Sequence, residues 1–191
     1  GVPTLVSDGD GYVTFEDLEE GKLYGFKCTL DNYKDTFVWN IEVGAIAEET
    51  LWILPNTVYQ MALGLAGLTQ DPDKSVVAGA VYWLEGKEEI GLGCGTVTSE
   101  PPTDDVRYMA EGNGLPTTLE NQPTTGCPDT EANGRYVVGN LPSGQVTMTA
   151  TDADGAVFGA TTLWSIAGAV AVSNIYPNDD VTAQPAAPCC N

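Results

Sequence analysis

The chain has 191 residues, 42% of them hydrophobic, which is enough to bury a core and excludes a globally disordered chain. Seven Lys and Arg against 27 Asp and Glu give a formal net charge of −20, which repels nucleic acid and anionic membrane surfaces and removes both as expected partners. Histidine is absent, so the commonest general base and zinc ligand are missing. Carboxylate-only hydrolysis remains as a chemistry, but no carboxylate pair is singled out for it, and we expect no enzyme.

Short runs of β-branched and aromatic residues, separated by 22 Gly and 12 Pro, predict a mostly β fold. The alternation is clearest over residues 145–151, where Val146, Met148 and Ala150 face one side and threonines face the other. Short strands at this spacing indicate an Ig-like or transthyretin-like sandwich. In chain order, the expected strands are residues 12–15, 23–29, 36–43, 76–84, 95–99, 107–109, 134–138, 146–152, 156–163 and 169–175.

One short helix interrupts this pattern near residues 56–68. Its expected apolar stripe, which should pack on a sheet, is formed by Val58, Met61, Leu65 and Leu68. The turn-rich stretch that follows predicts a boundary between an N-terminal β unit, 1–73, and a β-sandwich, 74–178. Residues 179–191 would form an extended tail that contains cysteines. Whether the N-terminal unit folds alone or adds to the sandwich stays open at this point.

Residues 75–177 resemble a carboxypeptidase regulatory-like, transthyretin-like domain. The resemblance is carried by Val-Ala-Gly-Ala-Val at 77–81, Gly-Arg-Tyr-Val-Val at 134–138, and the run Asn-Leu-Pro-Ser-Gly-Gln-Val-Thr-Met-Thr-Ala at 140–150. The segment between the first two, 85–133, is longer than is usual in that family. The resemblance implies a seven-stranded sandwich that serves as a scaffold or interaction module, without catalytic residues to carry over.

The acidic residues cluster in turns, and the clearest cluster lies near the N-terminus. The run from Asp8 to Asp17 resembles the calcium loop of EF-hand and dockerin modules, which implies Asp8, Asp10 and Asp17 as ligands and Tyr12 as a carbonyl ligand. The first ligand position of that pattern is Val6, which cannot coordinate. We therefore expect an incomplete site that another segment, another chain or water finishes.

A second acidic turn, at Asp152 and Asp154, repeats the D-x-D-G core of the first. Two partial sites in one chain could complete each other across a contact between subunits, with Ca²⁺ as the cofactor. A plain acidic turn is the alternative for both loops, because D-G is a strong hairpin signal by itself. A solubilising surface or adaptation to high salt would also explain the acidic composition.

The five cysteines include no C-x-x-C pair and, with the acidic composition, favour a secreted, extracellular protein. The chain starts at Gly1 and shows no signal peptide, so we expect it to be a mature product of proteolytic processing. Cys94 and Cys127 are the expected intradomain disulfide. Cys189 and Cys190 could tie the tail to Cys28 and leave one sulfur for a neighbouring chain.

These observations favour a calcium-stabilised structural or adhesive protein that forms a homo-oligomer, a filament, or part of an extracellular matrix or surface layer. The alternative is a non-catalytic module of a larger secreted protein that binds a glycan or a protein. Four tryptophans could form a sugar-stacking platform, although core packing is the commoner role for residues in apolar runs: Trp39, Trp52, Trp83 and Trp164.

Overall fold

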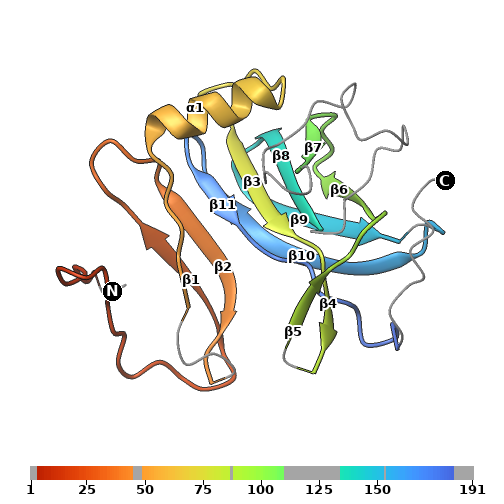
Figure 1. The fold of residues 1–191 in the computed structure, drawn as a ribbon, viewed down its shortest axis with the longest axis horizontal. Helices are drawn as coiled ribbons and strands as arrows, with labels where there is room; N and C mark the ends of the chain where they lie inside the picture. The colour runs from red at the N-terminus through yellow and green to blue at the C-terminus, as the bar shows by residue number, and fades with distance from the viewer. Residues whose placement is uncertain (1–3, 45–48, 87, 110–133, 153, 183–191) are drawn as a thin grey trace.

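A computed structural model describes residues 4–44, 49–86, 88–109, 134–152 and 154–182 (Figure 1). Its largest sheet has six strands in the order β1-β2-β11-β3-β8-β7. Strand β11 runs parallel to β2 and β3, and the other neighbours are antiparallel. The strands are, in this order, Leu23–Cys28, Thr36–Glu42, Val170–Val172, Ser75–Ala80, Arg135–Leu141 and Val106–Tyr108.

The pairing of β11 with β2 answers the question that the sequence left open. The first two strands form a hairpin, and β11 binds β2 on one side and β3 on the other. The N-terminal strands therefore add to the sheet of the C-terminal sandwich.

A second sheet packs on the first and has three strands in the order β10-β9-β6. These strands are Val157–Ser165, Gly144–Thr151 and Thr96–Glu100, and a small separate hairpin is formed by β4, Tyr82–Glu85, and β5, Glu88–Gly91. The inward residues of β9, namely Val146, Met148 and Ala150, are fully buried, as the alternation predicts. They meet Val77, Tyr136, Phe158 and Ile175 in the main core. The mostly β sandwich fold with one short helix is confirmed.

The helix α1, Asn56–Leu65, packs on the opposite face of the six-stranded sheet (Figure 1). Its buried side chains are Tyr59 and Leu63, and together with Ala66 just after the helix they contact a second core cluster formed by Val76, Val137 and Val170. The described part of the molecule thus has three layers, a helix on a large sheet on a small sheet.

The helix is present where the sequence predicts it, but the expected buried stripe was wrong. Val58, Met61 and Leu65 are 38%, 55% and 46% exposed, whereas Leu68, beyond the helix end, is buried. The helix carries no charged residue, and both of its faces bear apolar side chains. The spacing of Tyr59, Leu63 and Ala66 is equally helical, so periodicity alone could not choose between the two faces.

Two other expectations about strands need correction. Residues 12–15 form no strand, because the backbone of Tyr12 pairs within its own turn, with Asp8. The expected strand 76–84 is divided at Val81, whose N–H donates to Gly134 and whose carbonyl accepts the N–H of Leu92. The strand β5, Glu88–Gly91, was missed, since its sequence Glu-Glu-Ile-Gly has little β character and its pairing comes from the hairpin with β4.

Candidate functional site

The first acidic loop is closed by the side chain of Asp8. Its Oδ1 accepts the N–H groups of Asp10 at 3.0 Å and Tyr12 at 2.9 Å. The N–H of Asp8 donates to the carbonyl of Tyr12 at 2.9 Å, and the N–H of Gly11 donates to the carbonyl of Asp8 at 3.1 Å. Gly11 has φ +91°, which suits glycine. The loop is therefore a turn that Asp8 stabilises from within.

The second acidic loop, between β9 and β10, has the same four hydrogen bonds. Oδ1 of Asp152 accepts the N–H groups of Asp154 at 3.0 Å and Ala156 at 2.9 Å. The N–H of Asp152 donates to the carbonyl of Ala156, and the N–H of Gly155 donates to the carbonyl of Asp152. The shared D-x-D-G sequence thus encodes one recurrent turn, in agreement with the alternative that D-G supplies a turn signal by itself.

The two loops are not brought together as a single ion site. In Figure 1 the N-terminal segment lies beyond β1, on the side of the molecule away from the connection between β9 and β10. Among the residues that the structure describes, no group of three or more Asp, Glu or Cys side chains is arranged to hold a metal ion. Asp17 is exposed and has φ 61°, outside the turn that Asp8 closes.

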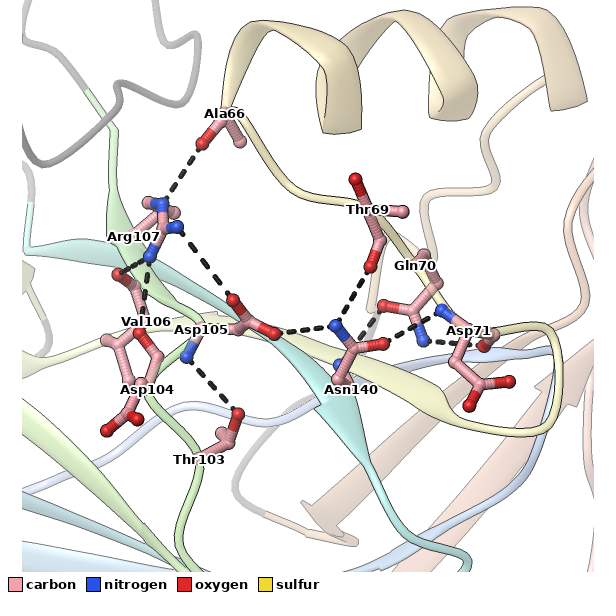
Figure 2. Close-up of polar contacts among 10 residues, drawn as sticks. All are labelled: Ala66, Thr69, Gln70, Asp71, Thr103, Asp104, Asp105, Val106, Arg107 and Asn140. Atoms are coloured by element: carbon pink, nitrogen blue, oxygen red, sulfur yellow. Dashed lines mark hydrogen bonds and ion pairs between the residues drawn. The ribbon is translucent and has the colours of Figure 1, made fainter.

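A polar network joins the end of α1 to β7 and β8, and Asn140 lies at its centre (Figure 2). The side-chain amide of Asn140 donates to the carbonyl of Thr69 at 3.0 Å and to Oδ2 of Asp105 at 2.6 Å, and its oxygen accepts the N–H of Asp71 at 2.8 Å. The backbone N–H of Asn140 donates to Gln70 at 3.1 Å. Asn140 adopts φ 55°, a left-handed conformation that Asn tolerates better than most residues.

Arg107 extends this network to the helix. Its Nε donates to the carbonyl of Ala66 at 3.0 Å, and one terminal nitrogen lies 3.9 Å from Oδ1 of Asp105 (Figure 2). These hydrogen bonds fix the loop after α1 onto the sheet. Asn140, the first residue of the Asn-Leu-Pro run that the sequence singles out, therefore has a structural role in this network.

Two tryptophans are buried in part and two are exposed. Trp39 and Trp83 pack against the main core, whereas Trp52 is 77% exposed and Trp164 is 54% exposed. Core packing, the interpretation that the sequence favoured for all four, therefore holds for Trp39 and Trp83 and is wrong for Trp52 and Trp164, whose rings are accessible.

The outer face of the small sheet is polar and nearly free of charge. Thr147 and Thr162 are hydrogen-bonded through their hydroxyls at 3.0 Å, and so are Thr96 and Thr151 at 2.5 Å. Trp164 lies on the same face, opposite Gln145 in the register of β9 and β10. Sequence reasoning recognised the threonine side of β9 but did not identify this face as a candidate site; the signal was the repeated T-x-T-x-T together with a tryptophan in the following strand.

Exposed apolar side chains gather in the first third of the chain. Of fifteen exposed large hydrophobic side chains in the described residues, eleven lie between residues 5 and 65. They include the outward stripe of α1 and, before it, Trp52 and Leu54. Among them, Val58, Met61 and Leu65 have helical spacing and form one apolar stripe on α1.

The structure tests the expected disulfides only in part. Cys94 is buried and disulfide-bonded, while Cys127 lies outside the described residues, so the pairing of these two stays a prediction. Cys28 is a free, half-buried thiol, and burial raises its pKa. The expected bond between Cys28 and the tail is therefore not formed, and Cys189 and Cys190 lie outside the described residues.

Comparison with known proteins does not assign the chain to a group: no family model matches it, and neither a curated protein nor a solved structure does. None of the helices in the described part of the chain has the length and apolar character needed to cross a membrane.

Proposed function

We propose that this chain is a non-catalytic, extracellular structural or adhesive protein that assembles with further copies of itself through the outer face of α1. The observation that carries the proposal is the outward stripe formed by Val58, Met61 and Leu65. A helix that is apolar on both faces is usually buried on both faces. In this molecule one face of α1 contacts the sheet, and the other is left for a partner.

Burial of this stripe in a contact would favour association. Burying a large apolar side chain contributes about 1.5–3 kcal/mol relative to full exposure, and Val58, Met61 and Leu65 each have much of this area still exposed. A second copy is the simplest partner, because a surface related to itself by two-fold symmetry needs no other gene product. The net charge of −20 opposes such a contact, so cations or salt should favour it.

In this proposal, Ca²⁺ ions neutralise part of the negative charge that opposes contact between copies. Asp8, Asp10 and Asp17 on one side, and Asp152 and Asp154 on the other, would each supply part of a coordination shell, with the remaining oxygens from a neighbouring chain or water. The turns at Asp8 and Asp152 are held by hydrogen bonds from their own backbone N–H groups, which would lower the entropy cost of binding.

The test is sedimentation velocity of the non-reduced protein over a range of concentrations. Met61→Gln combined with Leu65→Gln should weaken the apparent association by roughly tenfold or more, since 1.4 kcal/mol corresponds to tenfold. Leu84→Gln is the matched control, because it removes an exposed apolar side chain from β4, away from the helix. A native protein that stays monomeric at every concentration would overturn the proposal.

The calcium part is tested in the same experiment with about 2 mM CaCl₂ or with excess chelator, a concentration that fits extracellular calcium modules. Asp8→Asn and Asp152→Asn keep the oxygen that accepts two backbone amides and remove the charge. Assembly that shrinks on chelation and in these variants supports calcium. Assembly that is indifferent to both removes calcium and leaves the apolar contact standing.

A further inference from the structure

The outer face of the β10-β9-β6 sheet has an unusual composition for an acidic protein. Outward positions of a sheet are usually where a soluble chain places its charges, and this chain has 27 acidic residues to place. On this face only Glu100, at the end of β6, is charged. The outward residues of the three strands are Thr96, Thr98, Glu100, Gln145, Thr147, Thr149, Thr151, Val157, Ala160, Thr162 and Trp164.

The register arranges these side chains in rows across the sheet. Thr162 lies opposite Thr147, which lies opposite Glu100; Ala160 lies opposite Thr149, which lies opposite Thr98. Neighbouring strands are about 4.8 Å apart and outward residues along a strand are about 6.6–6.8 Å apart. The hydroxyls therefore form a flat grid of donors and acceptors rather than a pocket.

One end of the grid is occupied by Trp164. It is 54% exposed on the edge strand β10 and lies in register with Gln145, next to the Thr147–Thr162 pair. The hydrogen bond between these two hydroxyls limits their rotation and leaves the remaining lone pairs directed outward. An aromatic ring beside fixed hydroxyls and an amide is thus presented on a rigid sheet instead of a loop.

The chemistry of this face favours one kind of ligand. A sugar ring has an apolar face of C–H groups, which suits a tryptophan ring, and a rim of hydroxyls, which suits Thr and Gln side chains. Polymers that carry negative charge would be repelled by a protein of net charge −20, so the ligand should be neutral. A protein partner would require several apolar anchors at the centre of the contact, whereas the two exposed large apolar side chains of these strands, Val157 and Trp164, lie at opposite ends of β10.

We infer that the outer face of the β10-β9-β6 sheet binds a neutral glycan, with Trp164 stacked on a sugar ring and Gln145, Thr147 and Thr162 hydrogen-bonded to its hydroxyls. This site is separate from the outer face of α1, which lies on the far side of the six-stranded sheet. Glycan binding at this site would support an adhesive function, and it would not require the contact between copies.

The experiment is binding of the full chain to a panel of neutral polysaccharides: microcrystalline cellulose and chitin by pull-down, and soluble mannan and β-glucan by affinity electrophoresis. The native protein should bind at least one member, and anionic alginate should not be bound. Trp164→Ala should weaken binding by roughly tenfold or more, because an exposed aromatic anchor typically carries 1.4 kcal/mol or more of binding energy. Trp164→Tyr should retain most of it.

The matched control is Trp52→Ala, which removes an exposed tryptophan from outside the sheet. Thr147→Val and Thr162→Val keep the β-branched shape and remove the hydroxyls, and each should lower affinity severalfold without lowering the unfolding midpoint. Binding that is equal in native and Trp164→Ala protein, or equally reduced by Trp52→Ala, would overturn the inference. So would failure of the native protein to bind any neutral polysaccharide in the panel.

The outcomes separate this inference from the proposed function. Trp164→Ala should leave the sedimentation profile unchanged, and the Met61→Gln, Leu65→Gln variant should retain binding to the glycan as a dispersed protein. Loss of glycan binding with intact self-association removes only the sheet site, and the converse removes only the helix contact.

Discussion

At the scale of single residues, the chain uses small and polar residues to let distant segments approach closely. Gly79 in β3 is the clearest case, because a Cβ at this position would lie 2.0 Å from the carbonyl oxygen of Ser173 and 2.9 Å from the hydroxyl of Tyr136. That hydroxyl donates to the same carbonyl at 2.8 Å. The approach fixes the segment that follows β11 against the sheet.

Gly79→Ala should therefore destabilise the protein strongly. Because the contact is to backbone, the neighbour cannot move aside as a side chain could, and a loss of about 3 kcal/mol or more in the free energy of unfolding is expected. Gly64→Ala is the matched control, since its Cβ would meet nothing within 4 Å in α1, and Ala should gain about 0.5–1 kcal/mol over Gly there. Urea unfolding followed by tryptophan fluorescence measures both. Similar changes in the two variants would contradict this account.

The two acidic turns show how far a short motif can be interpreted at this scale. The D-x-D-G sequence correctly indicated that Asp8 and Asp152 lie in turns with an equivalent role, and their hydrogen bonds agree bond for bond. What the motif could not reveal is the environment of each turn. Further ligands would have to come from segments or chains that are distant in sequence, and spacing within the motif carries no information about them.

At the scale of elements, the two faces of α1 have different contacts. Substitutions on one face should therefore affect folding, and substitutions on the other should affect association. Leu63 is buried against the sheet and Met61 is 55% exposed. Leu63→Ala should lower the free energy of unfolding by about 2–4 kcal/mol, the cost of deleting buried methyl groups and leaving a cavity. Met61→Ala should change it by less than about 1 kcal/mol, since most of its area is already in water.

The measurement is urea unfolding of dilute protein, at a concentration where sedimentation shows monomers, so that association does not contribute to stability. If Met61→Ala were as destabilising as Leu63→Ala under these conditions, the outer face of α1 would be covered within the monomer. The contact that we propose between copies would then have no free surface.

The elements also show which parts of the fold were predictable from sequence. The alternation in β9 and the turn residues around it predicted the strand and its inward face, because one face of this strand is apolar and the other is threonine. In α1 both faces are apolar, so the pattern predicted a helix but assigned the wrong face to the core. The parallel pairing of β2 with β11 joins residues more than 120 positions apart, and local sequence contains no signal for it.

The candidate sites, like the elements, were predictable from the sequence only in part. Asn140 was noted as part of a turn motif, yet its partners Thr69 and Asp105 come from segments far along the chain, and only the folded structure brings them together. Trp164 was identified as an aromatic candidate, but its exposure depends on β10 lying at the edge of a sheet, which is a property of the topology.

At the scale of the whole molecule, the charge dominates. Only two ion pairs link side chains in the described residues, Lys27 with Asp35 and Arg107 with Asp105. Most of the acidic side chains therefore repel one another across the surface without a local cation, and this repulsion opposes the compact state. Salt that screens this repulsion should therefore stabilise the fold, even where no ion binds at a specific site.

We expect the urea midpoint to rise with NaCl between about 0.02 M and about 1 M, with most of the gain below about 0.3 M, where the Debye length falls below typical distances between surface charges. The effects of screening and binding are separated by CaCl₂ at matched ionic strength.

If the cation acts only by screening, CaCl₂ and NaCl of equal ionic strength should give the same urea midpoint. If calcium binds the acidic turns, about 2 mM should raise the midpoint beyond that value, and Asp8→Asn or Asp152→Asn should remove the excess while MgCl₂ fails to reproduce it. A midpoint that falls with salt would mean that attractive charge pairs, few as they are in the described residues, outweigh the repulsion from a net charge of −20.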